Sequence, residues 1–357
     1  MADKSKIEWT DASWTPIRAR NKTTGKVGWH CEHATPGCEG CYAESMNKRL
    51  GTGLPFKPGH RKDIEIFLDE EMLLQPLRWK KPRTIFVCSM TDLFADFVPD
   101  EWIDRVFAVM ALCPQHTFQV LTKRAEGMQT YVANMFRSTE APRGFVCPPW
   151  SVLLNRVERR WIDQNPDYMT TIRPLLLKAL VGRTLPVGPL PNIWFGTSAE
   201  DQRRYDERRE ALENTPAAVR FWSLEPLLGP IDLKLGEFGE EANPDWIIAG
   251  GESGIGARPM HPDWARSIRD QCEAAGVPFF FKQWGEWAPG ECGKHPMTRT
   301  ERTAEWFGDR WHFGSVTPET SEGMHIDDEP ELYRFGKSRS FRMLDGREHN
   351  EMPEVRP

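Results

Sequence analysis

Short runs of β-branched and aromatic residues recur along the chain, and each is bounded by turn-forming residues. Such runs are typical of buried strands. They are Thr84–Met90, Thr117–Thr122, Asn192–Thr197, Val219–Leu224, Asp245–Gly250 and Pro278–Lys282. Amphipathic segments with Pro, Asp or Glu near their starts lie between several of these runs, which predicts helices. The segments are Asp100–Leu112, Ala125–Phe136, Ala199–Asn214 and His261–Ala275.

The alternation of strand and helix predicts right-handed βαβ crossovers and a parallel sheet, either open or closed into a barrel. In both arrangements ligands meet the carboxyl ends of the strands. Polar residues follow all six runs at those ends, namely Ser89, Thr91, Asp92, Lys123, Arg124, Ser198, Glu200, Glu225, Glu252, Ser253 and Gln283. Helix capping explains any single one of them, but six polar ends together favour a ligand-binding mouth.

Two parts of the chain depart from the alternation. Residues 137–191 form an expected insertion of arginines and aromatic residues, which fits either contact with a polynucleotide or a helical cover with a solvated basic face. Its residues of this kind are Arg143, Arg156, Arg159, Arg160, Arg173, Trp150, Trp161 and Tyr168. Residues 286–357 show no clear periodicity, and we expect them to form a C-terminal extension that caps a barrel domain of residues 1–285.

The composition is that of a globular chain. Its 357 residues are 39% hydrophobic and 27% charged, which excludes disordered and collagen-like proteins. No window approaches the ~20 apolar residues of a membrane helix, and the first residues, MADKSKIEWTDASW, lack the apolar stretch of a signal sequence. We therefore expect a cytoplasmic protein with no membrane partner. Residues 18–62 carry nine Lys and Arg against three Glu, which fits either phosphate binding or a solvated surface.

Eight cysteines in a chain expected in the cytosol should be thiols or metal ligands, because disulfides are rare there. Cys31, Cys38 and Cys41 lie within eleven residues, in a loop that contains Pro and Gly, whereas the other five are scattered. Three thiolates hold a [4Fe–4S] cluster and leave one iron open for an outside ligand. Alternatively, His30 or His33 completes a closed zinc site of three Cys and one His. The spacing alone fits these two sites equally well.

The order of a cysteine loop, a helix and βα units with polar strand ends resembles the radical S-adenosylmethionine superfamily. Across residues 7–287 the chain is also similar to a phage-associated three-cysteine-motif family whose physiological role is unsettled. The matching stretches are IEWTDASWTPI, TPGCEGCYAE, FVCSMTDLFAD, LTKR, IIAGGESG and FFFKQWGEW. The superfamily resemblance implies an α/β fold, a partial TIM-type (β/α) barrel with parallel strands. The chain departs from the superfamily at Cys31 and Cys38, which six residues separate instead of three.

The resemblance also implies a cofactor site. In it, Cys31, Cys38 and Cys41 hold a [4Fe–4S] cluster whose open iron chelates the methionine part of S-adenosylmethionine. The residues implied to surround the cofactor are Tyr42, Ser89, Thr91, Asp92, Lys123, Ser198, Glu200, Gly250, Gly251 and Glu252. Tyr42 matches the Cys-Tyr of spore photoproduct lyase and its relatives. Lys123 is placed like the lysine that helps to hold the cofactor carboxylate in that group.

The other residues of this set follow different strands. Ser89, Thr91 and Asp92 lie where the superfamily binds the methionyl amino and carboxylate groups, and the resemblance puts Ser198 and Glu200 near the ribose or the amino group. The segment from Ile247 to Glu252 resembles the late strand that backs the adenine. For Glu252 two further interpretations stay open, contact with substrate and the capping of a helix beside a glycine turn.

The function implied by the resemblance is that of a radical S-adenosylmethionine enzyme. Such an enzyme generates a 5′-deoxyadenosyl radical for hydrogen abstraction, and the cofactor performs the difficult step. The basic stretch near the cysteines and the likeness to a nucleic-acid repair lyase favour a nucleotide or DNA base as substrate. A reductant protein for the cluster is then a partner. The alternative from a different class is a zinc-stabilised nucleic-acid-binding protein without catalysis.

Overall fold

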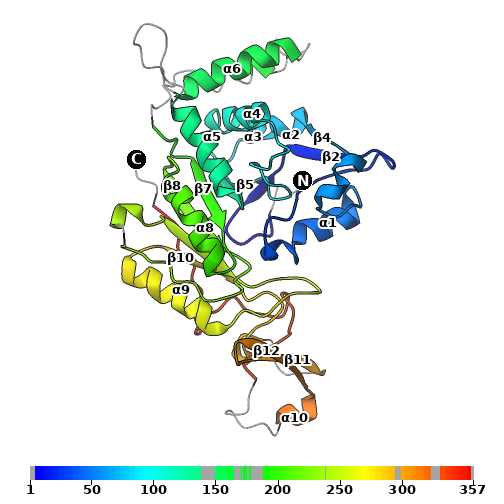
Figure 1. Cartoon of the computed structure of the whole chain (residues 1–357), viewed down its shortest axis with the longest axis vertical. Coiled ribbons are helices and arrows are strands. Elements are labelled where there is room, and N and C mark those ends of the chain that lie inside the picture. Colours follow the sequence, from blue (N-terminus) through cyan, green and yellow to red (C-terminus); the bar gives the residue numbers. More distant parts are fainter. Residues whose placement is uncertain are drawn as a thin grey trace.

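In the computed structural model, a large sheet covered by helices is accompanied by two small sheets formed near the two ends of the chain (Figure 1). The structure describes residues 5–137, 149–164, 170, 172–174, 177, 188–237, 239–293, 299–322 and 330–354. The predicted α/β class is confirmed.

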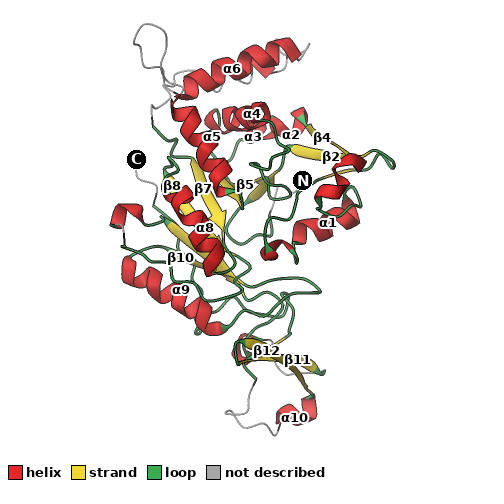
Figure 2. Ribbon diagram, in the orientation of Figure 1, coloured by secondary structure: helices red, strands yellow, loops and turns green. Residues whose placement is uncertain are grey.

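Seven parallel strands form the large sheet, in the order β1-β5-β6-β7-β8-β9-β10. The strands are β1 Ala12–Trp14, β5 Thr84–Val87, β6 Thr117–Thr122, β7 Ile193–Ser198, β8 Val219–Leu224, β9 Trp246–Gly250 and β10 Phe279–Gln283. Figure 2 shows that the sheet is curled, as a half-barrel. The six predicted strands and their parallel arrangement are confirmed, and β1 adds a seventh at the edge beside β5.

Helices in the crossovers pack against this sheet. The four predicted helices are confirmed as α4 Asp100–Ala111, α5 Ala125–Arg137, α8 Gln202–Glu213 and α9 Pro262–Ala275. Helix α8 begins later than predicted because Asp201 caps it, accepting a hydrogen bond from the backbone N–H of Arg204 at 2.9 Å. This start leaves Glu200 in the loop after β7.

The remaining elements are shorter or lie outside the crossovers. The further α-helices are α1 Tyr42–Leu50, α2 Glu70–Leu73, α3 Gln75–Arg78, α6 Pro149–Gln164 and α10 Pro318–Glu322. Short 3-10 helices are η1 Pro36–Cys38, η2 Pro58–Asp63, η4 Glu240–Ala242 and η5 Gly290–Cys292. One small sheet consists of β2 Ile17–Asn21, β3 Val27–Gly28 and β4 Ile64–Leu68, and the other of β11 Glu301–Phe307, β12 Arg310–Val316 and β13 Leu332–Tyr333.

The two faces of the curled sheet carry different hydrophobic clusters, because side chains alternate along each strand. In β9, Ile247 and Ala249 join the large cluster beneath the helices, while Trp246 and Ile248 join a second cluster. The second cluster is aromatic and includes Trp9, whose ring centroid lies 6.2 Å from that of Trp246. Trp9 precedes β1 in the chain, so this aromatic cluster fills the amino end of the half-barrel and leaves polar residues to its carboxyl end.

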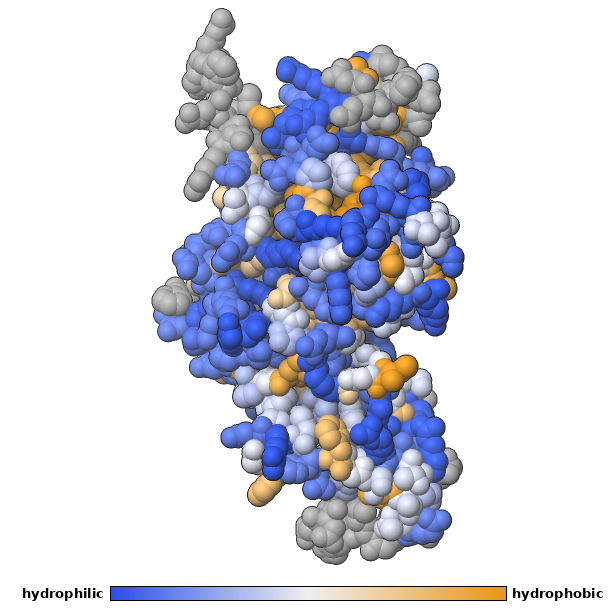
Figure 3. All heavy atoms as spheres, turned by 45° about the vertical axis from the view of Figure 1, so that its right-hand side comes forward, coloured by the Kyte–Doolittle hydropathy of each residue, from blue (hydrophilic) through white to orange (hydrophobic). Residues whose placement is uncertain are grey.

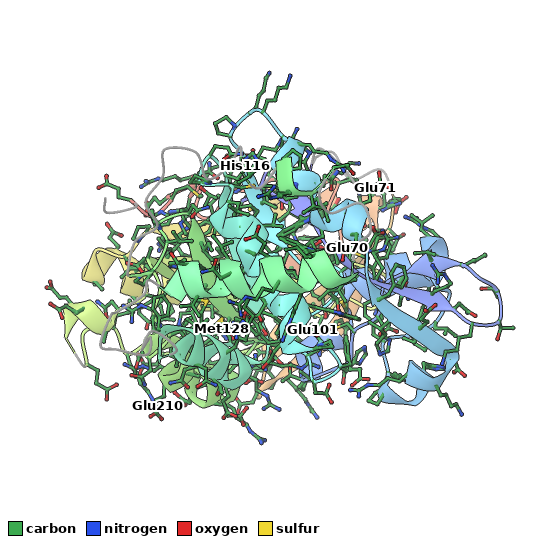
Figure 4. All side chains as sticks on the ribbon, turned by 90° about the horizontal axis from the view of Figure 1, so that it is seen from above. Glu70, Glu71, Glu101, His116, Met128 and Glu210 are labelled. Carbon is green, nitrogen blue, oxygen red and sulfur yellow. The ribbon has the colours of Figure 1, made fainter. Side chains whose placement is uncertain are left out.

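Helix α6 lies beside α4 at one end of the molecule (Figure 1). Figure 4, which looks down on α6, shows Glu101 of α4 beside it. Arg156 of α6 donates to Asp104 of α4 at 3.0 Å, and Arg160 lies 3.7 Å from both Glu101 and Asp104. These arginines of the predicted insertion are therefore engaged with acidic side chains of α4.

The aromatic residues of the same helix face inward. Trp150 and Trp161 are both 1% exposed and belong to the main hydrophobic cluster. Arg143 and Tyr168 lie outside the described residues. None of the helices in the described part of the chain combines the length and the apolar character that a bilayer crossing requires.

The extension after residue 286 divides into two parts. The first contains β11–β13, which Figure 1 shows as a lobe beyond the main sheet. The second returns to the free edge of β10, where the backbone N–H of Phe281 donates to the carbonyl of His349 at 3.0 Å. There Arg342 also donates to the carbonyls of Phe281 and Lys282 at 2.9 and 2.7 Å. This second part covers the exposed edge of the sheet.

Candidate functional site

The cysteine loop, residues 30–41, is tied to the carboxyl ends of four different strands. After β5, the Thr91 hydroxyl donates to the carbonyl of His30 at 2.6 Å. After β6, Arg124 donates to the carbonyl of Glu32 at 3.2 Å. After β7 and β9, Glu200 and Arg258 contact the loop at Gly37 and Pro36, at 3.0 Å each. The loop thus lies over the mouth that the sequence predicted.

The three loop cysteines are half-buried free thiols. Cys31 and Cys41 pack against the same small hydrophobic cluster, which contains Ala43, Phe56 and Met90. Burial raises the pKa of Cys31, and negative charge on Asp92, Cys41 and Cys38 raises it further. Burial also raises the pKa of Cys41. These thiols become thiolates readily only where a cation or metal compensates the charge.

The two kinds of metal site considered from the sequence place different demands on the cysteines. Among the described residues, no three His, Cys, Asp or Glu side chains lie close enough together to ligate one ion. A single zinc needs its ligand atoms about 2.0–2.3 Å from one point. The cysteines that hold a cubane bind three different irons, so they lie farther apart.

Both carboxylate oxygens of Asp92 accept hydrogen bonds that connect the ends of β5 and β6. One of its oxygens accepts from the hydroxyl of Thr122 at 2.7 Å and from the backbone N–H of Phe94 at 3.0 Å. The other accepts from the backbone N–H of Lys123 and from the Arg124 guanidinium, both at 3.0 Å. Since Asp92 is buried, these four bonds satisfy its charge. Its role in this structure is to position the neighbouring Lys123 and Arg124.

Lys123 and Glu200 form an incompletely matched pair beside the cysteine loop. The Lys123 ammonium lies 3.7 Å from Oε2 of Glu200, beyond hydrogen-bond distance, and both atoms are buried without a hydrogen-bond partner. Oε1 of Glu200 accepts from the backbone N–H of Gly37, and Arg208 lies 3.8 Å from Oε2. Burial acts to raise the pKa of Glu200, but Lys123, the Thr35 hydroxyl, Gly37 and Arg208 outweigh it and lower that pKa.

This pair is complementary to an amino acid. A buried polar atom without a partner is rare and calls for an explanation, such as a ligand. The ammonium of Lys123 suits a carboxylate, and Oε2 of Glu200 suits an ammonium group. Gly37 leaves no room between the loop and Glu200, because a Cβ there would lie 3.0 Å from the carboxyl carbon. The charges are therefore held in place against the loop.

Glu252, which follows β9, contacts the cysteine loop and holds Arg258 against it. It is 5% exposed and accepts three hydrogen bonds from Arg258, through the backbone N–H and two guanidinium nitrogens, at 2.7–2.8 Å. A Cβ at Gly40 would lie 2.3 Å from Oε1 of Glu252, so glycine is required for the loop to approach this carboxylate. Arg258 then reaches Pro36 of the loop. Glu252 therefore supports both the loop and Arg258.

The other predicted cofactor residues lie around the same mouth. The Tyr42 hydroxyl donates to the carbonyl of Ser89 at 2.9 Å, which joins the start of α1 to the loop after β5. Ser198 is buried at the end of β7, and its carbonyl accepts from Arg208. Gly250 and Gly251 are engaged through their backbones, accepting from Leu227 at 3.0 Å and donating to Gln283 at 2.9 Å.

Both histidines of the alternative zinc site are paired with carboxylates. Nε2 of His30 lies 3.3 Å from Oε1 of Glu32, which Arg61 also contacts, and Nε2 of His33 lies 2.5 Å from Oε2 of Glu44. Burial lowers the pKa of His30. Zinc-ligating histidines also pair with carboxylates, so these contacts are compatible with either site.

Comparison with known families gives one match. A family model described as "Protein of unknown function (DUF5131)" matches residues 4–353, nearly the whole chain. The chain belongs to this family. Neither the curated proteins nor the solved structures contain a match to this DUF5131 member.

Several residues that build the mouth of this DUF5131 member were not singled out from sequence as site residues. Arg208 and Arg258 lie far from the cysteines in the chain, so only the fold brings them to the loop. Lys282, at the end of β10, lies 2.6 Å from Oε1 of Glu225 after β8. A lysine inside the apolar run Pro278–Lys282 was a signal for this pair, because buried lysines are rare unless paired.

Proposed function

We propose that this DUF5131 member is a radical S-adenosylmethionine enzyme built on a partial TIM-type barrel. In this proposal Cys31, Cys38 and Cys41 hold a [4Fe–4S] cluster, and S-adenosylmethionine binds at its open iron. When bound, these groups supply an electron and a 5′-deoxyadenosyl radical for hydrogen abstraction. The observation that carries the proposal is the unmatched Lys123–Glu200 pair beside the three cysteines.

The pair provides the charges that the amino acid head of the cofactor needs. Lys123 would donate to its carboxylate, and Oε2 of Glu200 would accept from its amino group. Because both atoms are buried, each such bond is stronger than at the surface. The open iron of a cubane held by three cysteines would take the methionine part of the cofactor. The cysteines and the pair would therefore act on the same end of one molecule.

The fold provides the enclosure that radical chemistry requires. The aromatic cluster around Trp9 and Trp246 closes the amino end of the half-barrel to water. At the other end, Arg258, Glu200 and Thr91 fasten the cysteine loop to the strands, so the three thiols keep their positions. A preorganised, dry site stabilises developing charge without reorganisation of solvent.

The remaining parts of the proposal concern partners. A reductant protein would deliver the electron, and a nucleotide or nucleic acid would be the substrate. A cytoplasmic location goes with the proposal, because thiols stay reduced there. The alternative of a zinc-stabilised nucleic-acid-binding protein predicts bound zinc and no cleavage of the cofactor.

Oxygen-free reconstitution with iron and sulfide tests the proposal. After reduction with dithionite, the protein with S-adenosylmethionine should release 5′-deoxyadenosine. Cys38→Ala should abolish the release, whereas Cys272→Ala, a buried cysteine of α9, should leave it intact. A reconstituted protein that binds zinc and releases no 5′-deoxyadenosine would refute the enzyme and favour the alternative.

A further inference from the structure

A groove of about 590 Å³ lies between the loop after β9 and the β11–β12 hairpin. Four aromatic residues line it, Trp287, Trp306, Trp311 and Phe313. Figure 3 shows hydrophobic and polar atoms side by side on this lobe of the molecule. Phe313 is 54% exposed, and Ile255 on the opposite loop is 96% exposed. Large exposed apolar side chains of this kind, gathered at one groove, mark a binding surface.

Three arginines accompany the aromatic rings. Arg302 lies 5.7 Å from the ring centroid of Phe313 and 5.8 Å from that of Trp287, and Arg334 lies 5.8 Å from that of Trp287. Arg258 forms the side of the groove toward the cysteine loop. Among the described residues, no Asp or Glu lines the groove, and Arg302 pairs with no carboxylate, whereas Arg258 pairs with Glu252 outside the groove. Glu252 compensates the charge of Arg258, so Arg302 and Arg334 give the aromatic groove its positive charge.

The register of the β11–β12 hairpin shows which residues face the groove and which face away from it. Trp306 pairs with Trp311 and Ala304 pairs with Phe313, so these residues and Arg302 share one face of the hairpin. Phe307 and Arg310 pair with each other on the opposite face. The same two strands thus present aromatic and basic residues toward the groove. On the other face they carry one aromatic and one basic residue, Phe307 and Arg310, which serve as a comparison.

We propose that this groove binds a single-stranded polynucleotide, with bases on the aromatic rings and phosphates on the arginines. Stacked aromatic rings with interleaved cations are the means by which proteins hold single strands without reading their sequence. Arg302 and Arg334, with no carboxylate in the lining, favour a polyanion over a neutral protein surface. This inference rests on the proposed function, since it identifies the substrate class for the same mouth.

Arg258 connects the groove to that mouth. Its guanidinium lines the groove and also donates to the carbonyl of Pro36 in the cysteine loop at 3.0 Å. A strand that lies in the groove therefore runs past the loop. One of its nucleotides can turn from the groove toward the carboxyl ends of the strands, as in enzymes that act on an unstacked base.

Fluorescence anisotropy with labelled oligo(dT) and oligo(rU) of about twelve nucleotides tests the inference. The wild-type protein should bind at least one of the two more tightly than a duplex of the same length. Phe313→Ala should weaken binding by roughly tenfold or more, because it removes a stacking ring. Arg302→Ala should also weaken binding and should reduce the salt dependence by about 0.7 in log K against log salt.

Phe307→Ala and Arg310→Ala are the matched controls, and both should bind like the wild type. Equal losses in the groove variants and the controls, or no binding of either oligonucleotide at low salt, would overturn the inference. Release of 5′-deoxyadenosine without any nucleic acid, measured on the same samples, reports on the proposed function separately. Cofactor cleavage without oligonucleotide binding would refute the groove alone, and binding without cleavage would refute the enzyme alone.

Discussion

Replacement of Lys123 by Met separates the contribution of its charge from that of its bulk. The ammonium lies 3.7 Å from Oε2 of Glu200. At an effective dielectric constant of about 20, two unit charges at this distance attract by about 4 kcal/mol. The variant no longer has to bury an ammonium, and Arg208 remains 3.8 Å from Glu200. We therefore expect Lys123→Met to lower the free energy of unfolding by about 1–3 kcal/mol.

The loss should depend on pH. In the native protein the pKa of Glu200 is lowered, so its ionised form stabilises the fold above its usual pKa, and this stabilisation disappears as the pH falls through the lower, folded value. Without Lys123 the folded pKa rises and this contribution shrinks. The two proteins should therefore differ most near neutral pH and should converge once the pH falls below the lowered pKa of Glu200. Urea unfolding at several pH values measures the difference.

The effect on the cofactor is the more informative one. A hydrogen bond to a charged group is worth about 1.5–3 kcal/mol, so Lys123→Met should bind S-adenosylmethionine roughly 10–150-fold more weakly. Calorimetric titration of the iron-loaded protein measures this. Lys234→Met, which removes an exposed partner of Asp206, is the control and should bind normally. Wild-type affinity in Lys123→Met would refute the role that we assign to the pair.

Three other perturbations test the site and its support. Gly40→Ala should destabilise the protein by about 1–3 kcal/mol and weaken iron retention, because its Cβ would lie 2.3 Å from Glu252. Thermal melts and iron assays measure the two effects. Gly59→Ala, which has open space around it, is the control and should change neither the stability nor the iron content. Trp9→Ala should cost about 3–5 kcal/mol in urea unfolding, since the ring is 4% exposed within the aromatic cluster, and a loss below 1 kcal/mol would contradict that packing. Removal of the metal by a chelator should make the three half-buried loop cysteines reactive toward an alkylating reagent, and mass spectrometry counts the labels. The four buried cysteines that the structure describes should stay unlabelled. Equal labelling before and after chelation would argue against a metal at the loop.

The sequence predicted the central sheet because each strand is a short apolar run between turn residues. β1 escaped this reasoning, since Ala12–Trp14 is too short to show a pattern and is a strand only because it pairs with β5. The hairpin β11–β12 also escaped, although its side chains alternate in the structure. Polar and aromatic residues occur on both of its faces, so no contrast between a buried and a solvated face was visible.

The sequence predicted the position of the candidate site in the fold, but not the contacts between its residues. The rule that ligands meet the carboxyl ends of parallel strands located Lys123 and Glu200. It did not reveal that the Asp92 carboxylate accepts hydrogen bonds from Thr122 and Arg124, because these partners come from another strand. The dependence of the loop on Arg258 was likewise hidden, since residue 258 and Pro36 meet only in the folded chain.

Metal analysis of protein purified without oxygen tests the central claim most directly. The account predicts a brown protein with about four irons per chain, all lost in Cys31→Ala, and an electron paramagnetic resonance signal of the reduced cluster that changes when S-adenosylmethionine is added. A colourless protein that carries one zinc per chain, or a cluster whose signal ignores the cofactor, would contradict it.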